Sequence, residues 1–366
     1  MPVNRVPLPD GRGEMYLYHL TLKELLHLDT HLPFRLRLLS LAAPENAWPR
    51  RLLARWPLTL RRLVGQQLMH LGMGLRALRH READALLIME LFSYHSALLL
   101  PVLAATRKPT FIFSFWDQQL AQHSPFRRAG FLLLRAAARR FGFYILLPEI
   151  DDTELPPSYR YTGVRRVVLP MPVQPDLEPL HPAAWRPSAS HTYRIGLVGA
   201  PRKGKPLFAP AILEAVQAFV KHSPIPCEVV LGAPLQRATL PRLDIPHRTV
   251  DTGPVPAYQQ LLRSCDIVVL NYARDDYHFR SSGVVQDAAS AGAFVVCPAY
   301  PVMAHQISWP VPVGATFADP SNLARALETG LRHRQQHGVE AHWAWRGPRT
   351  AQPLAKRLSA ALHEAG

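Results

Sequence analysis

The residues best suited to chemistry lie in one stretch of the second half, 265–298, which reads CDIVVLNYARDDYHFRSSGVVQDAASAGAFVVCP. Ser281, Ser282 and Gly283 precede a run of small residues that predicts a helix, and serine is a favoured N-cap. The free amides at such a helix start favour an anion, most readily a phosphate. Asp287 follows Gly283 by four residues and therefore lies one turn further along the same face. Because its carboxylate would accept hydrogen bonds from a ribose diol, the stretch predicts a nucleoside-diphosphate site.

A second group of candidate residues lies at 194–207, in the sequence RIGLVGAPRKGKPL. A strand is expected to end at Gly199, and Arg202 and Lys203 follow beside a glycine turn. Two cations at the carboxyl end of a strand are placed to neutralise a diphosphate. Loss of a sugar from a nucleoside diphosphate builds negative charge on the leaving oxygens, which such cations would stabilise. The alternative is a surface loop with scattered charge.

The elements that must position these residues follow from the hydrophobic pattern. Short apolar runs alternate with longer segments of helical periodicity, which predicts an α/β protein with parallel, doubly wound sheets. Ligands of such sheets bind at the carboxyl ends of the strands. Two or three arginine-rich helices are expected within 34–80. The expected strands are 85–91, 110–115, 144–147 and 165–169 in the first half, and 193–198, 228–231, 249–252, 267–270 and 294–296 in the second.

A proline-rich passage separates the two halves, with six prolines between Pro170 and Pro187. Such a segment is stiff, extended and unable to join a central strand. We therefore expect two domains, each long enough to have a core. The predicted limits are an N-terminal domain at 1–170, a linker at 171–192, a second domain at 193–340 and C-terminal helices at 341–366.

The composition is that of a folded protein, with 48% hydrophobic and 19% charged residues in 366. The three cysteines have no metal-site spacing and read as buried thiols, and the histidines show no ligand spacing, so no metal is expected. The first residues, MPVNRVPLPDGRGE, lack the apolar segment of a signal peptide. We expect a cytoplasmic protein, peripheral on the cytoplasmic face of the membrane.

The net charge of +15 is concentrated in one region. Residues 31–81 carry ten arginines and a single acid, Glu45, and the arginines alternate with leucine, tryptophan and phenylalanine. A basic surface of this kind suits anionic headgroups, which predicts contact with an anionic membrane. The alternative is an exposed arginine face whose leucines pack the core. Nucleic acid is disfavoured, because no recognised nucleic-acid motif accompanies the charge.

Two residues of the first half are candidates for the acceptor side of a reaction. Asp117 follows the strand expected at 110–115, and a carboxylate there would orient an acceptor hydroxyl or remove its proton. Its alternative role is to cap the following helix. His95 begins a helix after the preceding strand and would line the same edge of the sheet, the alternative being a core or helix-end histidine.

Three motifs in order resemble the donor-binding domain of the retaining GT-B glycosyltransferases, the group 1 type family that uses nucleotide sugars. They are GLVG followed by RKG, then TGPVPAYQQLLRSCDIVVLNY, then YHFRSSGVVQDAASAGAFVV. The likeness covers about 193–335. It implies two Rossmann-like domains facing across a cleft, an N-terminal acceptor-binding domain at 1–170 and a donor-binding domain at 193–340, with C-terminal helices crossing back.

The resemblance also implies roles for individual residues. Arg202 and Lys203 would contact the donor diphosphate, and Gly199 would lie beneath the sugar. Ser281, Ser282 and Gly283 would form the amide nest near the phosphates, Asp287 would hold the ribose, and Val255 would flank the nucleobase. The donor is a substrate, and neither cofactor nor metal is implied.

The chain departs from this family at Phe279, which stands eight positions before Asp287 where the family has a glutamate. Asp275, Asp276 and His278 are the neighbours that would take over its sugar contact. The resemblance implies a hexosyltransferase that retains anomeric configuration and acts on a glycan or lipid-linked acceptor, in cell-surface polysaccharide or glycolipid synthesis. The alternative is a catalytically inactive protein that keeps the fold and binds the nucleotide sugar.

Overall fold

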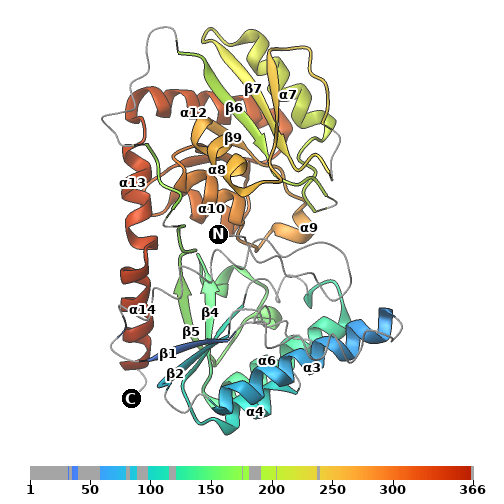
Figure 1. Cartoon of the computed structure of the whole chain (residues 1–366), viewed down its shortest axis with the longest axis vertical. Helices are drawn as coiled ribbons and strands as arrows, with labels where there is room; N and C mark the ends of the chain where they lie inside the picture. Colours follow the sequence, from blue (N-terminus) through green and yellow to red (C-terminus); the bar gives the residue numbers. More distant parts are fainter. Residues whose placement is uncertain are drawn as a thin grey trace. The chain divides into compact units, whose positions relative to one another are not determined.

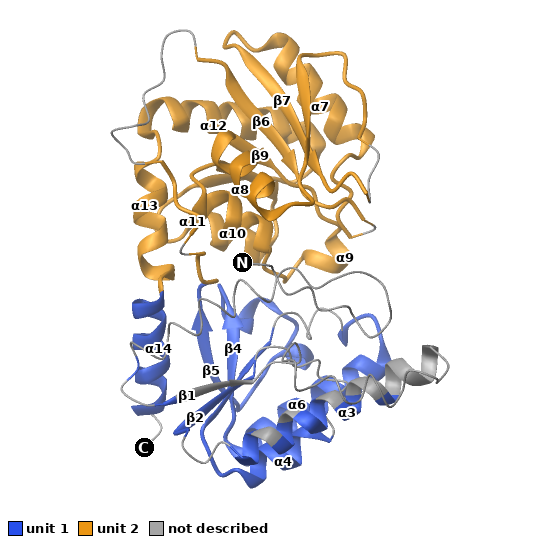
Figure 2. Ribbon diagram, viewed as in Figure 1, with its two compact units in different colours: residues 1–170, 351–366 blue, residues 171–350 orange. Residues whose placement is uncertain are grey.

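The computed structural model divides the chain into two compact units, residues 1–170 with 351–366 and residues 171–350 (Figure 2). In the part of the chain that the structure describes, each unit contains one parallel sheet. The domain limits given above stay a prediction. The residues that the structure describes are 32, 35–39, 58–79, 83–88, 98–114, 121–174, 176–180, 191–202, 204–236 and 240–363.

The sheet of the first unit has five described strands in the order β1-β2-β3-β4-β5, all parallel (Figure 1). Its strands are β1 (Leu36–Leu39), β2 (Ala85–Ile88), β3 (Thr110–Phe113), β4 (Tyr144–Pro148) and β5 (Arg165–Leu169). Its helices are α3 (Leu58–Arg79), α4 (Leu99–Ala105), α6 (Pro125–Phe141) and α14 (Ala351–His363). Apolar residues of β2, β3 and β4 form a core with α4 and α6, because alternate side chains of a strand point to one face.

Strand β1 is a correction to the sequence analysis, which placed arginine-rich helices throughout 34–80. The backbone of Leu36–Leu39 pairs in parallel with β2, Leu36 opposite Ala85. The alternation of arginine and leucine at 35–38 has the period of a strand, and pairing with a neighbouring strand decided the outcome. Helix α3 then occupies the second part of the region.

The sheet of the second unit is doubly wound. Its strand order is β11-β10-β9-β6-β7-β8, so the winding direction reverses between β9 and β6. Its strands are β6 (Tyr193–Val198), β7 (Cys227–Ala233), β8 (His247–Asp251), β9 (Ile267–Val269), β10 (Phe294–Pro298) and β11 (Gly314–Phe317). Its helices are α7 (Pro210–His222), α8 (Val255–Ser264), α9 (Arg274–Tyr277), α10 (Gly283–Ser290), α11 (Pro301–Ser308), α12 (Leu323–His337) and α13 (Glu340–Arg346).

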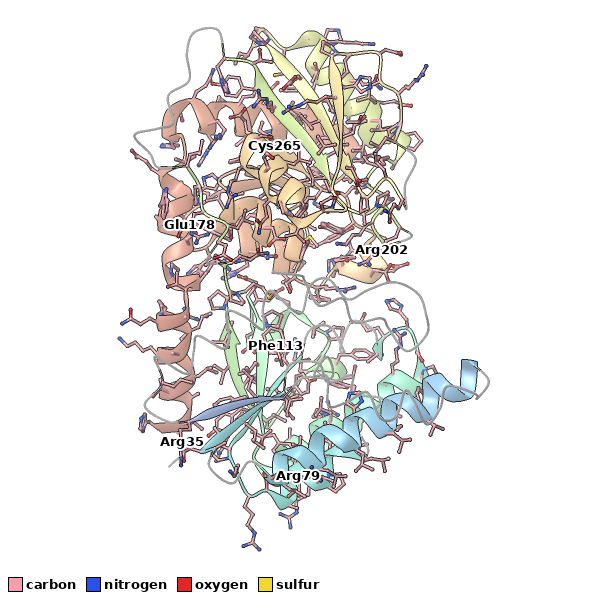
Figure 3. All side chains as sticks on the ribbon, in the orientation of Figure 1. Arg35, Arg79, Phe113, Glu178, Arg202 and Cys265 are labelled. Carbon is pink, nitrogen blue, oxygen red and sulfur yellow. The ribbon has the colours of Figure 1, made fainter. Side chains whose placement is uncertain are left out.

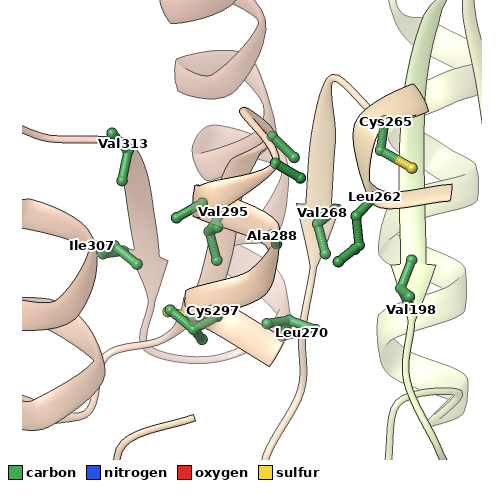
Figure 4. Packing of buried hydrophobic residues seen from close by; sticks show 14 of the residues in the cluster. Val198, Leu262, Cys265, Val268, Leu270, Ala288, Val295, Cys297, Ile307 and Val313 are labelled. Atoms are coloured by element: carbon green, nitrogen blue, oxygen red, sulfur yellow. The ribbon is translucent and has the colours of Figure 1, made fainter. Parts of the chain in front are cut away.

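Helices cover both faces of this second sheet. On one face, Val268 and Val295 pack against α8, α10 and α11 (Figure 4). On the other, Ile267 and Phe294 pack against α7 and α12. The prediction of an α/β protein built from parallel sheets is therefore confirmed.

Residues just after Pro170 belong to the core of the second unit. Val173 and Leu177 are buried in the same cluster as α8 and α10. The guanidinium of Arg346 reaches this segment and donates to the backbone oxygen of Leu177. The three cysteines are free and buried, as predicted. Among the described residues, no helix is both long and apolar enough to cross a bilayer.

Candidate functional site

The candidate site lies in the second unit, where β6 and β9 end side by side at the reversal of strand order. In open α/β sheets this is the point at which ligands bind. Gly199 follows β6 with a φ of +146°, a conformation that side chains rarely adopt, and its amide donates to the Gly232 oxygen. A small pocket opens beside it, lined by Val198, Gly199, Ala200, Lys205, Leu207, Leu270, Asn271, Tyr272 and Val284.

A tight turn places the cations of the 194–207 motif. The amides of Arg202 and Lys205 each donate to the other residue's backbone oxygen, at 3.1 and 2.8 Å. The Ala273 amide donates to the Gly204 oxygen at 3.1 Å and so ties this turn to the start of α9. Of the two cations predicted to contact a diphosphate, Arg202 is placed here (Figure 3), and Lys203 lies outside the described residues.

Lys205 is the residue that the sequence analysis missed. Its side chain is buried and lines the pocket. Its Nζ lies 5.2 Å from the ring centroid of Tyr272 and 5.5 Å from that of Tyr277. Burial lowers the pKa of Lys205, while the two ring faces favour the charged form. Nothing in the sequence RKGK distinguishes Lys205 from Lys203, because the position of Lys205 depends on the aromatic residues after β9.

Tyr277 gathers three cations around one ring. Arg202 donates from Nη2 to the Tyr277 hydroxyl at 3.2 Å, and the Arg280 guanidinium lies 4.6 Å from the ring centroid. Burial acts to raise the pKa of Tyr277, but the charges of Lys205, Arg280 and Arg202 outweigh it and lower that pKa. The three cations make the surroundings of Tyr277 favourable for an anion such as a diphosphate.

Helix α10 begins as predicted, but one of its amides is already used. Ser282 is the N-cap: its Oγ accepts from the Val285 amide at 3.4 Å and lies 2.6 Å from the Tyr272 hydroxyl. The Ser282 amide donates to Gln306 Oε1 at 3.2 Å. This amide is therefore not open to a phosphate, although the sequence had predicted that it would be. Ser281 is also buried, whereas Gly283 is half-buried.

Asp287 is buried behind this helix start, with 8% of its surface exposed. Its Oδ1 accepts from Gln174 Nε2 at 2.6 Å, and its Oδ2 accepts from the Tyr258 hydroxyl at 2.9 Å. Burial raises the pKa of Asp287 to about 7, although both hydrogen bonds act to lower it. The carboxylate thus joins α8, α10 and the segment after Pro170. A ribose hydroxyl that donates to this carboxylate would have to share it with Gln174 and Tyr258.

The remaining predicted residues are placed as follows. Phe279 packs edge-on against His278, with ring centroids 4.5 Å apart, and a second edge-on contact joins His278 to Tyr300. Val255 is the first residue of α8 and is half-buried. His95 and Asp117 lie outside the described residues, so their acceptor-side roles stay predictions.

No protein-family model and no curated protein matches this sequence. Solved structures do match its fold. HepE of Anabaena, in complex with UDP, has a TM-score of 0.54 at 12% identity, over 80% of this chain and 82% of that one. Sucrose-phosphate synthase from Thermosynechococcus elongatus has a TM-score of 0.53 at 11% identity, and the match covers 82% of this chain and 79% of that one. The N-terminal domain of Candida albicans trehalose-6-phosphate phosphatase has a TM-score of 0.53 at 11% identity, and the match covers 83% of this chain and 75% of that one.

At these identities the likeness concerns the fold and not the chemistry. Two observations agree with the resemblance found in the sequence motifs. The chain has two parallel sheets with flanking helices, and the match to these structures covers most of each chain. This chain has the GT-B fold of glycosyltransferases.

Proposed function

We propose that this protein is a retaining glycosyltransferase that uses a nucleoside-diphosphate sugar as donor. The observation that carries the proposal is the convergence of Arg202, Lys205 and Arg280 on Tyr277, beside a pocket at the carboxyl ends of β6 and β9. Cations held in this way suit the diphosphate of a nucleotide sugar. HepE, which shares the fold, has been solved with UDP-glucose, which supports a donor of this class.

In the proposed reaction the bond between the anomeric carbon and the diphosphate oxygen breaks, and negative charge grows on the departing phosphate. Arg202, Lys203 and Lys205 stabilise that charge, because cations fixed in a partly desolvated site need little reorganisation. The acceptor hydroxyl attacks from the same face and gives its proton to the departing phosphate, so configuration is retained. No protein nucleophile is required.

The other predicted donor contacts belong to the same proposal. Gly199 permits close approach of the sugar, and Ser281 with Gly283 borders the phosphates. Val255 flanks the nucleobase, and Asp287 holds the ribose together with its protein partners.

On the acceptor side, Asp117 orients the hydroxyl, and His95 is the second candidate for contact with the acceptor. The acceptor is a glycan or a lipid-linked glycan, in cell-surface polysaccharide or glycolipid synthesis. Residues 31–81 place the protein on an anionic membrane surface at the cytoplasmic face. The support for this location is the charge pattern, ten arginines against one acid.

A second candidate function is nucleotide-sugar binding without turnover. The observation that favours it is Phe279, an apolar ring where the family has a carboxylate, packed against His278. The two functions share the donor pocket and differ in whether the bond to the diphosphate is broken.

The test is incubation with UDP-, GDP- and ADP-sugars, with and without a lipid-linked glycan acceptor, while free nucleotide and melting temperature are recorded. Transfer predicts a thermal shift with one donor and nucleotide release. A shift without release supports the binding function, and no shift with any donor overturns both. Lys205→Met should lower donor affinity by about tenfold or more, the scale of a hydrogen bond to a charged group. Lys221→Met, on the exposed side of α7, is the matched control.

A further inference from the structure

Large apolar side chains are exposed mainly on three helices of the first unit. Of nine such exposed side chains among the described residues, seven lie on α3 and α6 or at the start of α4. Helix α3 packs directly on α4, since a Cβ on Gly74 would lie 2.9 Å from Leu99 Cδ1. The seven are Leu75, Leu78, Leu98, Phe126, Leu132, Leu133 and Phe141.

Helix α6 has two distinct faces. Phe131 and Leu134 are fully buried in the core of the unit. The opposite face is exposed along two adjacent rows with helical spacing, because residues three or four apart lie on one side of a helix. One row holds Arg128, Leu132 and Arg139, and the other holds Ala129, Leu133, Ala136 and Arg140. Leucine and alanine thus form the middle of the outer face, and arginines flank it.

Not every arginine of this helix serves the outer face. Arg135 donates from Nη1 to the backbone oxygens of Ser158 and Arg160, at 3.3 and 3.0 Å, and its guanidinium lies over the Phe131 ring. It is therefore used within the unit. Arg128, Arg139 and Arg140 are more exposed than Arg135, although the Arg128 guanidinium lies 5.6 Å from the Tyr159 ring centroid and Arg139 borders Gly163.

The charge of this surface is uniform. The sequence of α6 contains five arginines and no acidic residue. A surface of one sign repels a second copy of itself and attracts an anionic partner. The leucine and alanine in its middle offer hydrogen bonds to neither bases nor phosphates, whereas the boundary between headgroups and acyl chains accepts leucine beside arginine.

We propose that the outer face of α6 docks on an anionic lipid bilayer. Leu132 and Leu133 enter the interface, and Arg128, Arg139 and Arg140 contact the lipid phosphates. This surface lies outside the 31–81 segment discussed above. It orients the first unit on the membrane through a rigid helix whose inner face is anchored in the core. The proposal is independent of the donor chemistry, because docking requires no nucleotide sugar.

The test is co-sedimentation of the full chain with vesicles, in the absence of nucleotide sugar. Vesicles of phosphatidylglycerol with phosphatidylcholine are compared with pure phosphatidylcholine at low and at physiological salt. Leu132→Ser/Leu133→Ser removes the apolar part, and Arg128→Gln/Arg140→Gln removes two charges. The matched controls are Leu235→Ser, and Arg325→Gln/Arg332→Gln on α12, all exposed positions of the second unit.

We expect binding to the anionic vesicles and a loss of about fivefold in partition coefficient for each arginine removed. The leucine variant should lose about tenfold or more. Both controls should bind like the wild type, with melting temperatures unchanged throughout. The proposal is overturned if the leucine variant binds like the wild type, or if the controls lose as much. It is also overturned if a random-sequence RNA duplex is bound and the vesicles are not.

Discussion

Replacing Asp287 by asparagine should change how the stability of the second unit depends on pH. Asp287 is buried, and its pKa rises from the ordinary value of 3.8 to about 7 because burial disfavours the carboxylate. In the unfolded chain the group ionises near its ordinary value. Between these two pH values the folded state holds the proton that the unfolded state has lost. Stability therefore falls as pH rises from about 4 to about 7, and levels off above.

The size of the effect follows from the two pKa values. Each pKa unit corresponds to about 1.4 kcal/mol, so the wild type loses about 4 kcal/mol from this group across the window. Asparagine is uncharged at both ends of this pH window. Tyr258 can turn its hydroxyl to accept a hydrogen bond from the new amide, so any cost of the exchange is independent of pH. The difference in unfolding free energy, variant minus wild type, should grow in favour of the variant as pH rises.

Urea denaturation followed by tryptophan fluorescence, at intervals from pH 4 to pH 8, measures this difference. Subtraction of the two curves removes the contributions of all other titrating groups. Asp244→Asn, at an exposed position, controls for the loss of one negative charge. A difference that stays constant between pH 4 and pH 8 would refute the reasoning, since the carboxyl group would then be as well solvated folded as unfolded.

Three further outcomes are expected. Tyr277→Phe removes the acceptor of Arg202 but keeps the ring, so the KM for the donor should rise about three- to tenfold with little change in melting temperature. His342 is fully buried, and burial lowers its pKa below the ordinary value of 6.5. The unfolded chain therefore binds the proton more readily, and stability should fall as pH drops below about 6.5. His342→Gln should weaken this pH dependence in denaturant titrations. Gly314→Ala would press a methyl group into the backbone oxygen of Val295, and calorimetry should show a loss of about 1–3 kcal/mol.

The local features of the site could be predicted from the chain alone. The N-cap is Ser282, one of the two serines predicted before a run of small residues, and β6 ends next to Gly199, where the strand was expected to stop. Strands β6 and β9 lie within one residue of their predicted limits, and β10 continues two residues beyond its predicted end. These features depend on residues a few positions apart, so a short stretch of sequence contains all the information that they need.

Strands β1 and β11 were not predicted, because their structure depends on pairing with a neighbouring strand. β1 was assigned to a helical region, and β11, with the sequence GATF, has no β-branched run to mark it. Each lies at the edge of its sheet and pairs with one buried strand. Pairing with a neighbouring strand, more than intrinsic preference, determined both.

By itself, the sequence determined the α/β rhythm, the helix cap and the concentration of cations after β6. Only the tertiary structure decided how these groups are used. Lys205 is turned inward by aromatic rings that come about seventy residues later, the Ser282 amide is taken by Gln306, and Asp287 is held by Gln174, 113 positions away. Periodicity and capping are set by neighbours along the chain. Burial and hydrogen-bond partners are set by neighbours in space, which a linear pattern does not contain.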